Sequence, residues 1–249
     1  MAATGKLDDD PSITQADDVA GLLGADLEAG LTSQEAARRL AANGRNALRA
    51  ALRVPAWRRM LAHFQDPLIY LLLVAIAISL IAWAMDGGDG WPVDALVIAA
   101  IVILNGILGF VQESRAEDAV AALARMSEAT SAVLRDARLQ RVPSAELVCG
   151  DLLVLGEGDA VGADARLIQA TSLRVQEASL TGESEAVLKD SAVLPAAAEL
   201  GDRLNMVFKG TAVAQGSGRA VVTATGMDTQ IGAIAGMLDA TAESATPLQ

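Results

Sequence analysis

The sequence has almost none of the residues that build disulfide frameworks and histidine-based metal centres. It contains one cysteine, Cys149, and one histidine, His63, in 249 residues. A single cysteine excludes an internal disulfide and a paired-cysteine metal site, and a single histidine excludes a histidine cluster. We therefore interpret Cys149 as a small buried residue and His63 as an interfacial side chain, and we expect no metal site.

Positive charge is also scarce. The chain has 19 Lys and Arg residues against 31 Asp and Glu residues, which gives a net charge of −12. Binding to nucleic acid requires basic side chains that neutralise phosphates, so we exclude nucleic acid as a partner. The first residues, Met1–Pro11, are polar and acidic, and they predict no cleavable signal peptide.

Hydrophobic residues are abundant, at 52% of the chain, and two long runs, Leu68–Met85 and Ala95–Val111, carry no charge. As a helix the first run would extend about 27 Å, close to the roughly 30 Å thickness of a membrane core. The polar turn Asp86–Gly90 joins the runs. We predict a transmembrane helical hairpin, with one helix over 66–86 and a second over 91–126 that continues as a cytoplasmic stalk. A buried hairpin of a soluble protein is the alternative.

The flanks of this hairpin are basic, with arginines such as Arg58 before it and Arg115 after it. Since the turn carries only acidic residues and glycine, the positive-inside rule predicts that both termini lie in the cytoplasm and the turn lies outside. We expect a multi-pass protein of the plasma membrane. Trp57 and Leu61 recur at helical spacing and predict an interfacial helix over 55–65, with membrane lipid as its partner. The richness in Ala and Arg indicates a bacterial source.

The N-terminal part is predicted to be a small helical element over 16–54, preceded by a disordered tail over 1–15 because of its acidic composition. The best helix begins at Thr32, which forms a capping box with Glu35, and it ends at Gly44.

After the hairpin the hydrophobic pattern changes to short strand-like runs separated by glycine turns. This pattern predicts a compact all-β domain over 127–238, a distorted sandwich or jelly-roll-like fold. It includes a hairpin around the turn 135–138, a surface insertion over 187–204 and a terminal helix over 229–238. We interpret residues 239–249 as a linker.

Within this domain the stretch Leu180–Ser184 lies between two strand-like runs. We predict a turn, with Gly182 providing tight geometry and the carboxylate of Glu183 at its tip. A solvated acidic loop is the plain alternative. The attachment of the β domain to a membrane hairpin favours a carboxylate that reaches into another domain.

Several short stretches follow one another in the order of a known family. They are Asp66–Tyr70, Gly109–Glu117, Gly150–Leu152, Gly158–Asp164, Leu180–Ser184, Phe208–Thr211 and Ala224–Gly226. Together they resemble P-type cation-transporting ATPases of the calcium-pump-like, type II class. Two departures, Gly162 for a usual proline and Gln176 for a common acidic residue, are expected to change local rigidity.

The resemblance implies that the β domain is a cytoplasmic actuator domain and that Leu180–Ser184 is its dephosphorylation loop. In that loop Glu183 would orient a water molecule and accept its proton. Gly182 would allow a close approach to the phosphate. Thr181 and Ser184 would hold the loop or contact phosphate oxygens.

The resemblance also implies ATP and Mg²⁺ in the parent protein. Its partners would be the phosphorylation and nucleotide-binding domains and the later spans, including a third span toward which residues 239–249 lead. The sequence has no D-K-T-G-T stretch, so we expect an N-terminal fragment that binds no cofactor and is inactive alone. The ion is interpreted as Ca²⁺, with Mn²⁺, Na⁺/K⁺ and H⁺ as alternatives.

Two other functions stay open. One is a membrane-anchored regulatory or binding module without catalysis. The other is a heavy-metal pump, which is disfavoured because the sequence has no cysteine-pair metal domain and only one hairpin precedes the β domain.

Overall fold

The computed structural model describes residues 10–48, 67–85, 87, 90–126 and 129–243. The chain forms two compact units. Residues up to 49 and from 128 make up the first, here called the β unit, and residues 50–127 make up the second, here called the helical hairpin. The predicted interfacial helix over 55–65 and His63 lie outside the described residues.

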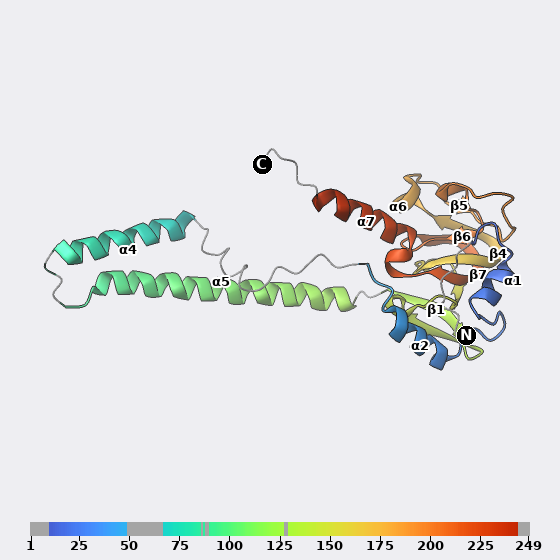
Figure 1. Ribbon diagram of the computed structural model, residues 1–249, viewed down its shortest axis with the longest axis horizontal. Coiled ribbons are helices and arrows are strands. Elements are labelled where there is room, and N and C mark those ends of the chain that lie inside the picture. Colours follow the sequence, from blue (N-terminus) through green and yellow to red (C-terminus); the bar gives the residue numbers. More distant parts are fainter. Residues whose placement is uncertain (1–9, 49–66, 86, 88–89, 127–128, 244–249) are drawn as a thin grey trace. The chain divides into compact units, whose positions relative to one another are not determined.

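The helical hairpin consists of α4 (Pro67–Met85) and α5 (Val93–Met126), which pack against each other in antiparallel directions (Figure 1). Both predicted helices are therefore confirmed as helices. Large apolar side chains point outward, and Leu104 is 65% exposed. Among the described residues, one stretch, Val93–Ala116, is long and apolar enough to cross a membrane, with a mean hydropathy of 2.4; the apolar stretch of α4, Ile69–Met85, is shorter.

The β unit is built on one antiparallel sheet with the strand order β2-β1-β3-β7-β4-β5, and β6 also pairs with β4. The strands are β1 (Thr130–Arg135), β2 (Arg138–Pro143), β3 (Leu152–Leu155), β4 (Asp164–Gln176), β5 (Val187–Leu188), β6 (Met206–Val207) and β7 (Ala212–Ala224). The predicted hairpin around residues 135–138 is confirmed. Asp136 and Ala137 both adopt positive φ, at 52° and 57°, as a two-residue type I′ turn requires.

The sheet encloses its own core because its two long strands bend. β4 and β7 pair along their lengths with several register shifts, and such bulges kink a strand and increase its twist. As a result Leu167 and Leu173, on either side of the bend in β4, enter the same apolar core. The predicted all-β domain is confirmed.

Within the β unit, the helices of the N-terminal element pack against the β domain. In α1 (Ala16–Leu22), Val19 packs with Val221 of the sheet, and in α2 (Ser33–Asn43), Ala36 packs with Val148. The other helical elements of the described residues are α6 (Ala178–Thr181), α7 (Gln230–Glu243) and the short 3-10 turns Ser144–Glu146, Leu200–Asp202 and Gly226–Asp228. The helical element and the β domain thus form one unit.

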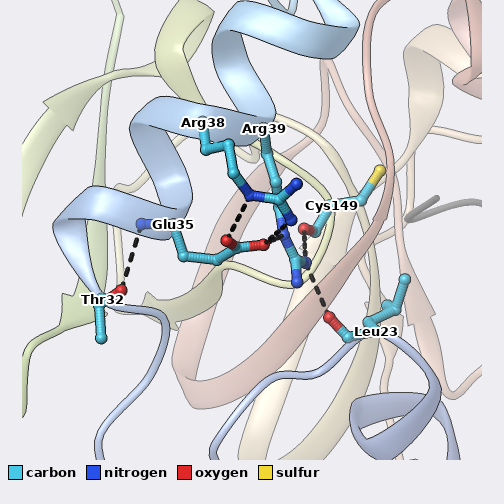
Figure 2. A network of polar contacts seen from close by, with 6 residues as sticks. All are labelled: Leu23, Thr32, Glu35, Arg38, Arg39 and Cys149. Carbon is cyan, nitrogen blue, oxygen red and sulfur yellow. Dashed lines mark hydrogen bonds and ion pairs between the residues drawn. The ribbon is translucent and has the colours of Figure 1, made fainter. Parts of the chain in front are cut away.

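Side-chain contacts of α2 attach it to two distant segments (Figure 2). The Thr32 hydroxyl accepts the N–H of Glu35 at 3.2 Å, which confirms the predicted cap. The Glu35 carboxylate does not return to Thr32 to complete the capping box; it accepts the Nε of Arg39 at 2.7 Å instead. Arg39 Nη1 in turn donates to the carbonyl oxygens of Leu23 and Cys149, each at 2.7 Å. One guanidinium therefore joins α2, the end of α1 and the turn before β3.

Two boundary predictions are wrong. The predicted disordered tail over 1–15 fails for residues 10–15, because Ser12 is fully buried and its carbonyl accepts Nδ2 of Asn205 at 2.7 Å. The partner lies far along the chain, so composition alone could not indicate it. The terminal helix, α7, continues to Glu243, into the predicted linker.

Candidate functional site

The predicted turn at residues 180–184 contains a short helix. Residues Ala178–Thr181 form α6, and Gly182 ends it with φ 78° and ψ −5°, donating its N–H to the carbonyl of Ala178 at 3.0 Å. A left-handed residue in this position favours glycine. No atom lies within 4 Å of where a Cβ on Gly182 would stand, so backbone conformation rather than space requires glycine.

Glu183 and Ser184 follow at the exposed tip of the loop. The Thr181 hydroxyl donates to the carbonyl of Glu177 at 3.1 Å and accepts the N–H of Glu183 at 3.3 Å. Among the described residues, the Glu183 carboxylate has no hydrogen-bond or ion-pair partner. The structure thus brings the four predicted site residues together and leaves one carboxylate available to an incoming group.

Gln176 ties the far side of the loop. Its Nε2 donates to the carbonyl of Ser184 at 2.6 Å. An ionised carboxylate has no proton to donate, so an acidic residue at this position could not make the contact. Glutamine at position 176, where the family commonly has an acidic residue, therefore makes this hydrogen bond possible.

A buried ion pair lies at the base of the loop. Glu177 Oε1 is 2.6 Å from Lys189 Nζ, and the two side chains are 1% and 0% exposed. Lys189 Nζ also lies 5.5 Å from the centroid of the Phe208 ring, within the range of a cation–π interaction. Burial raises the pKa of Glu177 and lowers the pKa of Lys189, and the attraction between the two charges opposes both shifts.

Sequence reasoning missed this pair. The available signal was a charged residue at each end of the loop, close to a strand-like run: Val175-Gln176-Glu177 on one side and Val187-Leu188-Lys189 on the other.

A groove of about 340 Å³ adjoins the loop. Its lining includes Thr181 and the three acidic residues Glu183, Glu199 and Asp202. The described residues contain no group of three or more His, Cys, Asp or Glu side chains placed to hold a metal ion. Because this surface is acidic, a phosphate could approach only with compensating positive charge from elsewhere. A larger cavity of about 610 Å³, lined by residues such as Asp164, includes none of the predicted site residues.

Several of the other family-like stretches converge on a polar network that supports the fold. The buried carboxylate of Asp164 accepts the backbone N–H groups of Lys209 and Gln230, each at 2.8 Å. Burial raises the pKa of Asp164, and these two amide donors oppose that shift. Asn46 Oδ1 accepts Lys209 Nζ at 2.8 Å and the N–H of Gly226 at 2.7 Å. Parts of the chain that resemble the family are thus held together in space.

Gly162, the other departure, lies in a tight contact. A Cβ there would stand 2.4 Å from Ser131 Oγ and 2.8 Å from Leu147 Cδ1. The absence of a side chain allows this close packing.

Comparison with known families matches two models to most of the chain. Residues 125–239 match the P-type ATPase actuator domain, and residues 12–79 match the N-terminal domain of cation transporters and ATPases. The chain therefore belongs to the P-type ATPase family, and it contains the actuator domain of that family.

Its relatives include named cation pumps. It is 40% identical over 222 residues to a calcium-transporting ATPase of Listeria monocytogenes. The alignment covers 89% of this chain and 24% of the relative. It is 42% identical over 224 residues to a calcium-transporting ATPase of Bacillus subtilis, covering 90% of this chain and 24% of the relative. It is also 42% identical over 233 residues to a probable cation-transporting ATPase F of Mycobacterium bovis. That alignment covers 94% of this chain and 25% of the relative. The chain thus spans about a quarter of the length of these relatives.

Proposed function

We propose that the β unit promotes hydrolysis of an aspartyl-phosphate intermediate in a bacterial cation pump, with Glu183 as the residue that activates water. The observation that carries this proposal is the exposed Glu183 carboxylate, without a partner among the described residues, on a loop that hydrogen bonds hold in place. Membership of the P-type ATPase family supports it.

Hydrolysis of an aspartyl phosphate by water requires one group that accepts a proton from the attacking water. A water oxygen attacks phosphorus, the bond between phosphorus and the aspartyl oxygen breaks, and the aspartyl carboxylate leaves. Glu183 takes the proton that the attacking water loses, as a general base. Gly182 keeps the backbone beside the phosphate free of a side chain. Thr181 holds the loop through the contacts of its hydroxyl with the backbones of Glu177 and Glu183. Ser184 is placed to contact a phosphate oxygen.

The acidic groove defines what a partner must supply. A phosphate near Glu183 would be repelled unless cationic groups offset its charge. A phosphorylation domain with bound Mg²⁺, and ATP as the phosphoryl donor, would meet that requirement. In the assembled pump, α4 and α5 lie in the membrane with both chain termini in the cytoplasm, and motion of the β unit is coupled to ion movement. Ca²⁺ is the proposed ion, since two of the relatives carry that name.

The test is a chimera in which the complete 249-residue chain replaces the matching quarter of the Listeria relative. Phosphoenzyme is formed from labelled ATP, and its decay is followed after a chase with unlabelled ATP. Glu183→Gln should leave phosphoenzyme formation intact and slow its decay by about 100-fold or more, the usual contribution of a general base. Glu185→Gln is the matched control, because Glu185 is an exposed glutamate of the same loop.

Normal decay in Glu183→Gln would remove this residue from the mechanism. Adding the purified chain to a relative that lacks its own actuator separates catalysis from regulation. A catalytic module should restore phosphoenzyme decay, whereas a purely regulatory module should not.

A further inference from the structure

The two ends of the Glu183 loop meet at its base. Glu177 leaves β4, and Lys189 follows β5 with its backbone N–H donated to the carbonyl of Leu173 at 2.8 Å. Their side chains form the ion pair at 2.6 Å, and both are almost completely buried. The pair therefore connects the segment that enters the loop to the segment that leaves it.

Stability alone is a poor explanation for this pair. Removing two charges from water carries a large desolvation cost, and apolar replacements of similar volume are often neutral or stabilising. The surroundings offset the cost on the lysine side, where Nζ also donates to the carbonyl of Arg203 at 3.3 Å and faces Phe208. Glu177, by contrast, has no hydrogen-bond partner on either carboxylate oxygen among the described residues, and only Oε1 has the ion-pair contact with Lys189. A buried carboxylate with so few partners indicates a role in fixing geometry.

A short series of contacts leads from the pair to Glu183. The carbonyl of Glu177 accepts the N–H of Leu180 at 2.9 Å, the N–H of Thr181 at 3.0 Å and the Thr181 hydroxyl at 3.1 Å. The same hydroxyl accepts the N–H of Glu183. The position of Glu177 therefore sets the start of α6, and one hydroxyl connects that start to the backbone of Glu183.

We propose that Glu177 and Lys189 are positioning residues, whose buried ion pair presents Glu183 to the phosphate. The inference rests on the proposed function of Glu183. Neither residue contacts the reacting atoms. The pair holds the base of the loop in one conformation so that the carboxylate at the tip meets the attacking water in a fixed orientation.

The test uses the same chimera with Lys189→Met, Glu177→Gln and the double variant. Each single variant leaves a buried charge or polar group without its partner, so it should lose thermal stability as well as activity. The double variant removes both charges and should recover most of the stability. Its phosphoenzyme should still decay about 10-fold to about 100-fold more slowly than the unsubstituted chimera, because a displacement of about 1 Å can cost about 100-fold in rate.

Arg135→Met is the matched control. Arg135 forms another buried ion pair, with Asp151, and neither residue belongs to the loop. This variant should lower thermal stability while leaving phosphoenzyme decay unchanged. Hydrogen exchange on the complete 249-residue chain adds a readout without phosphoryl transfer: the peptide spanning 177–184 should exchange faster in the double variant, whereas β1 should not.

A double variant with unchanged phosphoenzyme decay and unchanged exchange at 177–184 would overturn the proposal. Glu183→Gln, measured alongside, separates the two claims. If it stalls decay while the double variant decays normally, only the positioning role is lost. If Glu183→Gln itself decays normally, the proposed function falls.

Discussion

The helical hairpin and the β unit differ in which side chains they expose and which they bury. In the hairpin, apolar side chains such as Leu104 face outward, and each helix satisfies its own backbone hydrogen bonds. In the β unit, charged side chains are buried and connect segments that are far apart in sequence. Local composition therefore defines the hairpin, whereas the β unit depends on individual long-range polar contacts.

Arg166 is the extreme case in the β unit. Its side chain is fully buried, and the carbonyl oxygens of Pro11, Ser191 and Asn205 accept its guanidinium hydrogens at 2.9, 3.1 and 3.3 Å. Burial lowers its pKa, although a guanidinium stays charged at neutral pH. One buried cation thus orders the N-terminal segment against the sheet and the loop that follows β5.

The largest effect is expected where a buried ion of the β unit loses its partner. Arg135 Nη2 lies 2.5 Å from Asp151 Oδ2, and Asp151 is fully buried. Arg135→Met should lower the free energy of unfolding by about 3–5 kcal/mol, because an uncompensated charge stays buried. This change in the free energy of unfolding is measured by urea unfolding of the full chain in detergent, with hydrogen exchange of β-unit peptides as the readout.

The control for this prediction is Arg141→Met. Arg141 pairs with Asp159 at 3.2 Å, but its side chain is 61% exposed. Its loss should change stability by at most about 1 kcal/mol. Equal effects in the two variants would contradict the distinction between buried and exposed pairs.

A second change tests the hairpin. Leu104→Asp should raise the free energy of membrane insertion of α5 by about 3 kcal/mol, given the cost of Asp near the centre of a spanning helix. The stability of the β unit should not change. Glycosylation-based insertion assays measure the first effect, with Leu104→Ile as the control. Normal insertion of the Asp variant would argue against a membrane-embedded α5.

The smallest effect concerns Glu35 and its two arginine partners on α2. Hydrogen bonds from Arg38 and then Arg39 lower the pKa of Glu35 from 4.5 to about 2. The folded state therefore gains stability from ionised Glu35 above about pH 4.5, and it loses that gain as the pH falls toward 2. The difference in melting temperature between the unsubstituted chain and Glu35→Gln should shrink over this interval.

Glu157→Gln is the control, since Glu157 lies exposed in the turn after β3. Its difference from the unsubstituted chain should stay small at every pH. A difference for Glu35→Gln that does not vary between pH 5 and pH 2 would show that the arginine contacts do not stabilise the fold.

Local patterns predicted much of the candidate site. Gly182 and Glu183 form a recognisable turn in the sequence, and the structure places them in one exposed loop. The short helix α6 was missed because four residues are too few for a helical period. The ties from Gln176 and Lys189 were missed because each depends on a partner 8 or 12 residues away whose position is set by the pairing of β4 with β5.

Local sequence patterns were enough to predict the apolar helices, the cap of α2 at Thr32, the short strands and the position of the acidic loop. Those features follow from hydrophobic period, capping chemistry and turn residues, which act over a few neighbouring positions. Three features could be seen only in the folded chain: residues 10–15 are ordered, β4 and β7 bend over one core, and Glu177 and Lys189 meet beneath the loop. Burial creates these contacts, because a charge withdrawn from water must find its partner wherever the fold brings one.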